Sequence, residues 1–436
     1  MQLELIEIAI ALLAVMATAL ILGVWVGLAL ILCGIAAMMF VANVPVSAVF
    51  ATTVWSANAS WTLAALPLFI WMGEILFRTR LSEELFRGLA PWVGWLPGRL
   101  VHVNVLACGI FGMVSGSSAA TCATIGKIAL PELTKRGYDE RITIGSLAGS
   151  GTLGLLIPPS IIMIVYAVQA EVSLLQMFLA GFLPGGVVML LYCGYIAIWS
   201  LMNPDKQPPP EPRMSFRQSI KESANLFPTL LLIVFVFGAL ISGAATATEC
   251  AAWGVFGALA IAWWQNSLTL ESFWASVMGA TRTTAMIMLI LGGAAFMSAA
   301  MAYTRIPAAI ADGVASLDLG PSMLIACLTI FYIILGMFLD GISMIVLTMA
   351  IVLPLVQKAG FDLIWFGIFV VLVVEMAQVS PPVGFNLFVL QSMSGRDSWT
   401  VALAALPFFI LLIVAVAIIT VFPSIALFLP RLVFPA

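Results

Sequence analysis

Residues 115–160 read SGSSAATCATIGKIALPELTKRGYDERITIGSLAGSGTLGLLIPPS. A stretch 223 positions later has Pro, Gly and Asp residues at the same spacing. The later stretch begins near Leu339-Asp340-Gly341 and reaches Ser380-Pro381-Pro382. One constant offset relates Pro131 to Pro354, Gly137 to Gly360, Asp139 to Asp362, Pro158 and Pro159 to Pro381 and Pro382, and Pro184 to Pro407. The chain is therefore predicted to contain two halves of similar construction.

Each half carries its Pro-Pro pair inside a hydrophobic run. Proline lacks an amide hydrogen and clashes with the preceding turn, so such a pair breaks a helix. The carbonyls that the break frees are tolerated at membrane depth only when they are buried in protein, line a cavity or bind something. Two interrupted spans at corresponding positions indicate the binding site of a secondary transporter. The alternative is that both pairs are simple kinks.

The composition is that of a membrane protein. Of the 436 residues, 63% are hydrophobic and only 8% are charged, with a mean hydropathy of +1.16. Soluble domains have about 25% charged residues, so most of this surface is expected to face the lipid bilayer. The net charge of −3 favours no nucleic-acid partner. Six scattered cysteines and a single histidine, His102, make a zinc site or a His-based catalytic triad difficult to assemble.

The hydrophobic runs predict ten membrane crossings, two of them broken, within an all-α polytopic fold. Residues 1–100 are predicted to form first-half scaffold spans, with a polar connection at 43–60 and an interfacial arm at 81–100. Residues 101–200 hold the first hairpin, the first broken helix and a further span, and 201–225 form a cytoplasmic linker. Residues 226–321 repeat the scaffold, with an interfacial segment at 270–281 and a separate span at 284–301. Residues 322–436 hold the second hairpin, the second broken helix and the last span.

Two half-length apolar runs on either side of a small polar tip describe each predicted hairpin, which re-enters the membrane without crossing it. The first hairpin has its tip at residues 115–118, and the second has its tip at Asp340 and Gly341. In this topology fourteen of the 17 Lys and Arg residues fall on one side, which the positive-inside rule makes cytoplasmic. Both termini are then periplasmic, and the two halves are inverted copies of each other.

Asp340 is the residue that most strongly indicates ion binding. A carboxylate at membrane depth costs about 2.5 to 3.5 kcal/mol on insertion scales, and no Lys or Arg lies in the adjacent runs. A hard cation, sodium or a proton, held with carbonyl oxygens of the tip and of the break near Ser380 is the partner that we expect. The alternative is that the carboxylate snorkels or accepts hydrogen bonds from tip amides.

In the first half, Ser117 occupies the position that corresponds to Asp340. Residues 115–118 and 149–152 offer hydroxyls, free amides and close backbone approach. They predict a second cation site or a carboxylate-binding site at half-helix N-termini. The alternative is that the small residues only permit tight helix packing.

Other polar residues carry less information about function. Glu375, Gln378 and Asn386 flank the second break and are expected to supply polar lining. The sequence around Gly126-Lys127 lacks the spacing of a phosphate-binding loop, so ATP hydrolysis by this chain is not expected. An intramembrane hydrolase that uses Ser150 as its nucleophile is a further hypothesis, but it has no visible base.

Over nearly its whole length the chain resembles the large membrane subunit of tripartite ATP-independent periplasmic (TRAP) transporters. The segments that carry the resemblance are 67–74, 112–121, 130–133, 137–141, 149–160, 336–340 and 380–389. Two departures stand out, because the family's usual Thr-Pro-Thr-Glu is Thr246-Ala247-Thr248-Glu249 here and its usual Thr-Pro-Pro is Ser380-Pro381-Pro382.

The resemblance implies an inverted-repeat, elevator-type importer of organic acids such as C4-dicarboxylates. It implies sodium as the coupling ion, no cofactor, no enzymatic activity and a bacterial inner-membrane location. It also implies two partners, a small membrane subunit and a periplasmic substrate-binding protein. A self-sufficient Na⁺ or H⁺ symporter without a binding protein remains the alternative.

By this similarity two sodium sites and one substrate site are expected. The expected sodium ligands are Ser115, Gly116, Ser117, Gly149, Gly151 and Thr152 for the first ion, and Asp340, Gly341, Gln378 and Ser380 for the second. The expected substrate-binding residues are Ser118, Pro158, Pro159, Ser160, Pro382, Gly384 and Asn386.

Overall fold

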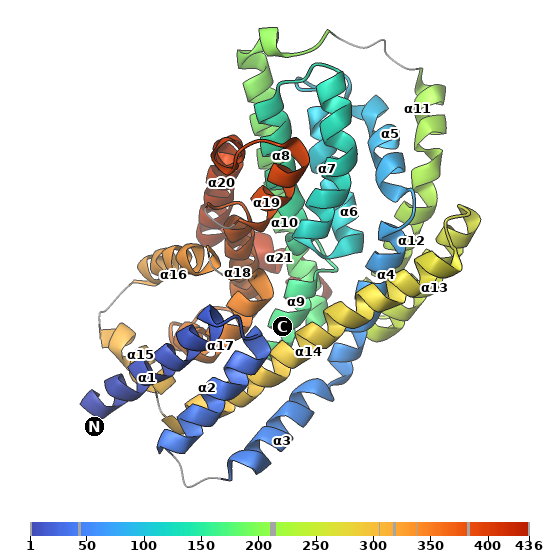
Figure 1. The fold of residues 1–436 in the computed structure, drawn as a ribbon. Helices are drawn as coiled ribbons and strands as arrows, with labels where there is room; N and C mark the ends of the chain where they lie inside the picture. Colours follow the sequence, from blue (N-terminus) through green and yellow to red (C-terminus); the bar gives the residue numbers. More distant parts are fainter. Residues whose placement is uncertain are drawn as a thin grey trace.

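The computed structural model describes residues 2–41, 45–209, 215–304, 306–316, 320–337, 339–381 and 384–434. All regular secondary structure within these ranges is helical (Figure 1). The helices of the first half are α1 (Gln2–Ile21), α2 (Val26–Val41), α3 (Val46–Asn58), α4 (Ala65–Phe77), α5 (Leu81–Val93), α6 (Val101–Ser115), α7 (Ser118–Lys135), α8 (Glu140–Leu156), α9 (Ile161–Gln169) and α10 (Leu174–Met202). Those of the second half are α11 (Phe216–Ser223), α12 (Phe227–Ile241), α13 (Ala247–Trp264), α14 (Leu270–Thr304), α15 (Ile306–Ser316), α16 (Pro321–Gly336), α17 (Gly341–Lys358), α18 (Leu363–Gln378), α19 (Phe385–Ser394), α20 (Ser398–Val421) and α21 (Ser424–Val433).

The internal repeat predicted from the sequence is present in the helices. Helices α6 and α7 form hairpin 1, and α16 and α17 form hairpin 2. After hairpin 1 comes a helix pair, α8 and α9, that is bent by 42° at residues 157–160, which we call break 1. After hairpin 2 come α18 and α19, separated by residues 379–384, which we call break 2. Pro382 and Val383 of break 2 lie outside the described residues.

Glycines and aspartates at equivalent positions end and begin the equivalent helices. Gly137 (φ 80°) and Gly360 (φ 78°) follow α7 and α17 in the left-handed region that favours glycine. Asp139 accepts hydrogen bonds from the first amides of α8, and Asp362 accepts the equivalent bonds at the start of α18. The helices α8 and α18 therefore begin at equivalent positions of the two repeats.

Two expectations about the scaffold are wrong. The segment 43–60 is not a plain polar connection, because it contains α3. The hydroxyls of Thr52 and Thr53 bond to carbonyls one turn earlier and so fit a helix. The stretch 201–225 stays a predicted linker between the halves, and its described part contains α11, which begins with a capping box between Ser215 and Gln218.

The second correction concerns α14, which was expected as an interfacial segment and a separate span. It is one helix of 35 residues. Its buried residues Ser276, Ala280, Thr284 and Ile287 form one continuous stripe at helical spacing, so the face that packs inward does not change at Arg282. In Figure 1 α14 is the long yellow diagonal, with α3 below it and α9 above it.

The scaffold packs along α14. Helices α2 and α3 lie against its C-terminal part, where Phe50 and Phe296 meet edge to face at 5.1 Å, and α4 packs on both α13 and α14. The two halves meet in a second layer, where α8 contacts α18 and α20, α17 contacts α9, and α19 contacts α7. This layer is called the transport core below, and it consists of α6–α10 and α16–α20.

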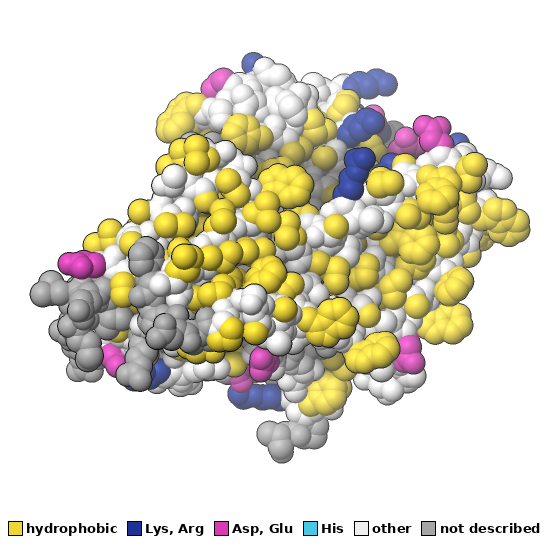
Figure 2. Space-filling view, turned by 60° about the horizontal axis from the view of Figure 1, so that its bottom comes forward, with side chains coloured by type: hydrophobic (Ala, Val, Ile, Leu, Met, Phe, Trp, Pro, Cys, Tyr) yellow, Lys and Arg dark blue, Asp and Glu magenta, His cyan; other side chains and the backbone are white. Residues whose placement is uncertain are grey.

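The surface and the helix lengths fit a membrane-spanning protein. Figure 2 shows one face that is largely hydrophobic, with charged side chains at its edges. In the described ranges five helices are long and apolar enough to cross a bilayer, or six when α8 and α9 count as one span. Several shorter apolar helices, including α4 and α18, accompany them, and the ten crossings counted from the sequence stay a prediction.

Candidate functional site

The tip of hairpin 1 gathers hydroxyl and carbonyl oxygens. Gly116 has φ 58° and lets the chain turn between α6 and α7, and Ser117 caps α7 by accepting a hydrogen bond from Ala120 N. The hydroxyls of Ser115 and Thr121 lie 2.7 Å apart, and Thr121 donates to the Ser117 carbonyl at 2.8 Å. Thr121 was not among the expected site residues, although it follows Ser117 by one helical turn.

Break 1 lies directly against this tip. A Cβ on Gly116 would be 3.0 Å from the Pro159 carbonyl oxygen, so only glycine permits this approach. Pro158, Pro159 and Ser160 are all buried, and the Ser160 hydroxyl has no hydrogen-bond partner. A buried unpaired hydroxyl is the kind of group that a bound ion or solute would satisfy.

The same tip also packs closely on α8. A Cβ on Gly154 would lie 2.7 Å from Thr121 Oγ1 and 2.8 Å from the Ser117 carbonyl oxygen. Hence the hairpin tip, break 1 and the last turns of α8 form one contact region.

Ser118 and Asn386 connect this region to the second half. The Ser118 hydroxyl donates to Asn386 Oδ1 at 2.9 Å, and Asn386 Nδ2 donates to the Ala148 carbonyl at 3.2 Å. Gly151 lies beside the same amide, since a Cβ there would be 3.1 Å from Asn386 Nδ2. Two of the expected substrate residues, from halves far apart in the sequence, are therefore in direct contact.

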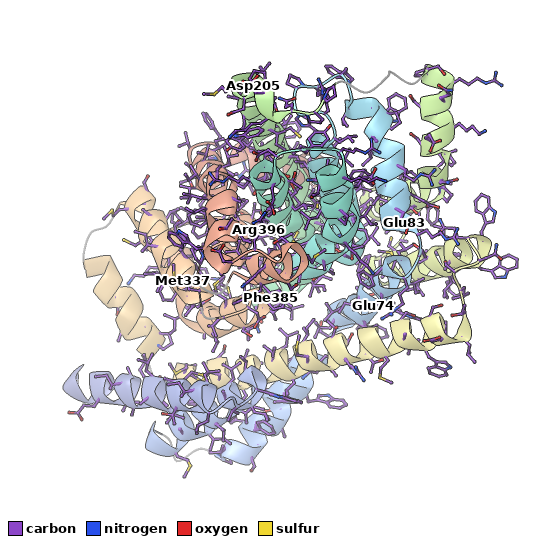
Figure 3. All side chains as sticks on the ribbon, turned by 45° about the horizontal axis from the view of Figure 1, so that its top comes forward. Glu74, Glu83, Asp205, Met337, Phe385 and Arg396 are labelled. Carbon is purple, nitrogen blue, oxygen red and sulfur yellow. The ribbon has the colours of Figure 1, made fainter. Side chains whose placement is uncertain are left out.

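Helix α19 is tied to the first half at its other end as well. Arg396, just beyond α19, makes two hydrogen bonds of 2.7 Å to the carboxylate of Glu140, the first residue of α8. Figure 3 labels Phe385, at the start of α19, and Arg396, after its end. The second broken segment thus lies along α8 and hairpin 1.

Asp340 does not have the environment that the sequence suggested. The residue is exposed, and its carboxylate accepts hydrogen bonds from the amides of Ile342 and Ser343 and from the Ser343 hydroxyl. The expectation of a buried carboxylate without protein partners is wrong. Asp340 is the N-cap of α17, and the alternative stated above, hydrogen bonds from amides of the tip, is what the structure shows. Its role as a cation ligand stays a prediction.

The tip of hairpin 2 packs against the end of α18. A Cβ on Gly341 would be 2.5 Å from Val374 Cγ1, and one on Gly336 would be 2.2 Å from Ala377 Cβ. The contact positions on α18, Val374 and Ala377, are the equivalents of Gly151 and Gly154 on α8. Both hairpins therefore pack on the same face of their own broken helix.

Break 2 is compact in its described part. Gln378 and Ser380 are buried, the Ser380 hydroxyl donates to the Ala377 carbonyl, and Gly384 N donates to the Ser380 carbonyl at 2.9 Å. Gly384 fits closely, since a Cβ would be 2.8 Å from the carbonyl oxygens of Gln378 and Ser380. Pro382, an expected substrate residue, lies outside the described residues.

The residues expected to bind the first sodium do not all converge. Gly151 faces α7 and α19, whereas a Cβ on Gly149 would be 2.6 Å from Phe408 of α20. Thr152 faces two other helices. It lies beside Glu375 of α18 and beside Tyr192 of α10. The tip, break 1 and Gly151 come together, and Gly149 and Thr152 lie elsewhere on α8.

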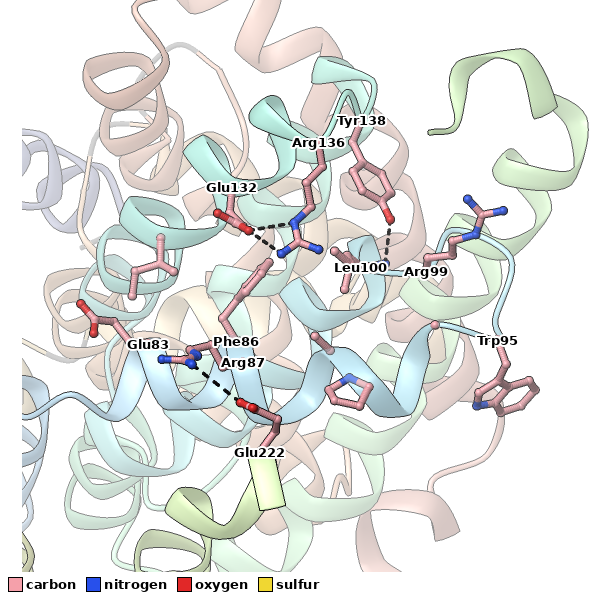
Figure 4. A pocket seen from close by; sticks show the side chains of 14 residues that line it. Glu83, Phe86, Arg87, Trp95, Arg99, Leu100, Glu132, Arg136, Tyr138 and Glu222 are labelled. Atoms are coloured by element: carbon pink, nitrogen blue, oxygen red, sulfur yellow. Dashed lines mark hydrogen bonds and ion pairs between the residues drawn. The ribbon is translucent and has the colours of Figure 1, made fainter. Parts of the chain in front are cut away.

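Two cavities flank the transport core. One of about 810 Å³ lies between α5, α7 and α11, and Figure 4 shows the charged residues around it. Ion pairs join Arg136 to Glu132 and Arg87 to Glu222 in its wall. The other cavity, of about 690 Å³, lies between α3, α14, α9 and α17. Each borders the second helix of one hairpin, α7 or α17.

Hairpin 1 and break 1 together carry uncharged oxygens from which a cation site could be built. Hydroxyls of Ser115 and Thr121, the Ser117 and Pro159 carbonyls and the unpaired Ser160 hydroxyl are all uncharged oxygens of the kind that alkali and alkaline-earth ions prefer. In the described part of the chain, no group of three or more His, Cys, Asp or Glu residues could hold a transition metal.

The sequence matches a known protein family over nearly its whole length. The sequence pattern of the family described as "Tripartite ATP-independent periplasmic transporter, DctM component" matches residues 13–425. The C4-dicarboxylate TRAP transporter large permease protein DctM of Pseudomonas aeruginosa is 33% identical over 382 residues, which are 87% of this chain and 89% of that protein. The sialic acid TRAP transporter large permease protein SiaM of Vibrio cholerae is 28% identical over 375 residues, which are 86% of this chain and 87% of that protein.

A solved structure shares the fold. The YdaH transporter of Alcanivorax borkumensis superimposes with a TM-score of 0.65 at 10% identity, covering 86% of this chain and 88% of that one. The family match covers nearly the whole chain and identifies it as a membrane transport component and not an enzyme. The chain belongs to the DctM component family of tripartite ATP-independent periplasmic transporters.

Proposed function

We propose that the chain is the large permease subunit of a sodium-coupled importer of a small organic acid, with a C4-dicarboxylate as the substrate class. The observation that carries the proposal is the contact between two inverted halves at the Ser118–Asn386 hydrogen bond, beside hairpin 1 and break 1. Ser118, Ser160 and Asn386 supply hydroxyl and amide groups for a carboxylate. The P. aeruginosa relative carries C4-dicarboxylate in its name, which favours this class.

Sodium would bind at the two hairpin tips. At hairpin 1 the uncharged oxygens around Ser115, Thr121 and Pro159 would hold one ion. At hairpin 2 Asp340 would contribute its charge, with break 2 supplying further carbonyls. A cation at each tip would hold that hairpin against its broken helix and so link ion binding to the geometry of the substrate site.

The charge that moves constrains the energetics. Each net charge crossing about 100 mV contributes about 2.3 kcal/mol. Two sodium ions with a dianionic substrate carry no net charge, so the membrane potential would contribute nothing. Import then depends on the sodium concentration gradient, unless a third cation is bound.

We propose that the transport core moves against the α14 scaffold in an elevator motion. The two cavities support this, because each lies between scaffold or arm helices and the second helix of one hairpin. The cavity rich in arginine would open to the cytoplasm by the positive-inside rule, with both termini periplasmic. The surface beside hairpin 2 would then receive the substrate.

The word tripartite in the family description implies two further components. We propose a small membrane subunit, which would cover part of the exposed hydrophobic scaffold, and a periplasmic substrate-binding protein, which would deliver the acid. The location would be the bacterial inner membrane. The competing hypothesis is a symporter that works without a binding protein.

Reconstitution separates the two hypotheses. The chain and its small subunit are placed in liposomes under an inward sodium gradient, and uptake of radiolabelled succinate is measured with and without the binding protein. The proposal predicts uptake only when the binding protein is present. Robust uptake by the chain alone would favour the self-sufficient symporter.

A further inference from the structure

Thr152 and Glu375 occupy equivalent positions in the two repeats and lie side by side where α8 meets α18. Equivalent residues of an inverted repeat that contact each other lie on its pseudo-two-fold axis. Tyr192 of α10 lies beside both residues. This cluster is on the opposite side of α8 from Gly151 and Gly154, which face hairpin 1.

The Glu375 carboxylate lacks the partners that a buried charge requires. The residue is 0% exposed, and neither carboxylate oxygen has a hydrogen bond of ordinary geometry, although the Thr152 hydroxyl and the Leu156 amide lie close to it. The ion pairs formed within the described ranges use other carboxylates, namely Glu74, Glu132, Glu140, Glu222 and Asp312. A charged carboxylate left in this state is strongly unfavourable, so Glu375 is stabilised either by a proton or by a cation taken up from solution.

The neighbouring hydroxyls present oxygen lone pairs. Thr152 donates its hydroxyl hydrogen to the Gly149 carbonyl at 2.7 Å, so its remaining capacity towards Glu375 is as an acceptor. The Tyr192 oxygen is buried and has no hydrogen-bond partner. Two carboxylate oxygens and two hydroxyl oxygens from three helices form a hard oxygen set. A monovalent ion neutralises the single carboxylate, whereas a divalent ion would leave a buried excess charge.

We propose that Glu375, Thr152 and Tyr192 form a sodium site on the pseudo-two-fold axis, distinct from both hairpin tips. The inference rests on the proposed function only for the identity of the ion. Such a site supplies the third cation that would make import of a dianion electrogenic. It also joins α8, α10 and α18, so occupancy strengthens the contact between the two halves.

The test uses the purified chain in detergent and measures its thermal unfolding midpoint as NaCl replaces KCl at constant ionic strength. The variants are Glu375→Gln, Thr152→Val and Asp340→Asn. Glu271→Gln serves as the matched control, because Glu271 is exposed at the start of α14. We expect sodium to raise the midpoint of the unmodified chain and Glu375→Gln to weaken the apparent sodium affinity of that rise by about tenfold or more. Thr152→Val should weaken it less, and Glu271→Gln should leave it unchanged.

The outcomes distinguish this site from the proposed sodium coupling. If sodium stabilises the chain and Asp340→Asn weakens the effect while Glu375→Gln does not, the axial site is wrong and the coupling stands. If sodium has no effect on the unmodified chain, both are wrong. Infrared spectra in sodium buffer give a second readout, the carbonyl band of a protonated carboxylic acid. If the unmodified chain shows this band and Glu375→Gln lacks it, Glu375 binds a proton, and the assignment of a sodium site is overturned.

Discussion

The Ser118 hydroxyl donates a hydrogen bond to Asn386 Oδ1 at 2.9 Å and so joins the first turn of α7 to the first turn of α19. Ser118 is 3% exposed and Asn386 is 0% exposed, so no bulk water competes for this bond. Asn386 also donates to the Ala148 carbonyl, which places its amide between hairpin 1 and α8. The bond makes the substrate region a joint product of both halves.

This hydrogen bond predicts that substitutions of its two residues reduce stability by different amounts. Asn386→Ala should destabilise the chain by about 1–3 kcal/mol, because it leaves the buried Ser118 hydroxyl without a partner and removes the second hydrogen bond that the Ala148 carbonyl accepts beside its helical one. Ser118→Ala should cost less, since the Asn386–Ala148 bond survives. A double-mutant cycle by reversible detergent unfolding should give a coupling of about 0.6 kcal/mol and no more than about 1.7. Strictly additive effects would show that the bond is absent in the protein.

Asp340→Asn is expected to separate ion binding from folding. Asparagine also caps helix N-termini, so the start of α17 is retained, but the negative charge is lost. The sodium concentration for half-maximal uptake by the reconstituted system should rise by about tenfold or more. Asp362→Asn is the matched control, because Asp362 caps α18 in the same way at a position away from the tip. A normal sodium curve for Asp340→Asn would contradict the assignment.

Gly154→Ala tests the contact between hairpin 1 and α8. The added Cβ would fall 2.7 Å from Thr121 Oγ1 and 2.8 Å from the Ser117 carbonyl, so the tip must shift. We expect a loss of about 1–3 kcal/mol in stability together with slower uptake. Gly186→Ala in α10 meets open space and should be neutral or stabilising by about 0.5–1 kcal/mol, as measured by the same unfolding assay. Equal effects of the two substitutions would argue against the packed tip.

The departure at Ala247 offers a stabilising substitution. Thr246 caps α13 in a reciprocal capping box with Glu249, and Ala247 is the first helical residue. Proline is preferred at that position because its φ is already helical and the missing amide hydrogen is not needed there. Ala247→Pro should therefore raise stability by about 0.4–1 kcal/mol. Ala251→Pro, inside the same helix, should instead cost about 3 kcal/mol, and a rise in its unfolding midpoint would refute this description of α13.

The hairpins and breaks could be predicted because their signals are local. Pro158-Pro159 ends α8 wherever the helix lies, and Gly137 with Asp139 fixes the end of α7 and the start of α8 through backbone geometry and capping. The same residue types recur in the second half, so a prediction for one half applied to the other.

Contacts between distant helices could not be predicted in this way. The pairing of Ser118 with Asn386, and of Thr152 with Glu375, depends on how α8, α18 and α19 pack, which no local pattern encodes. Asp340 was expected to be unpaired because no side chain of opposite charge lies in the adjacent runs, whereas its actual partners are the free amides at the start of its own helix. The sequence also did not show that residues 270–281 and 284–301 form one continuous helix.

The most direct test of the account is sodium-driven uptake by the complete reconstituted system. Liposomes containing the chain and its small subunit receive binding protein and radiolabelled succinate outside, and initial uptake is compared with an inward sodium gradient and with equal sodium on both sides. The account predicts accumulation above the external concentration only with the gradient. Accumulation of the same extent without any sodium gradient would contradict it.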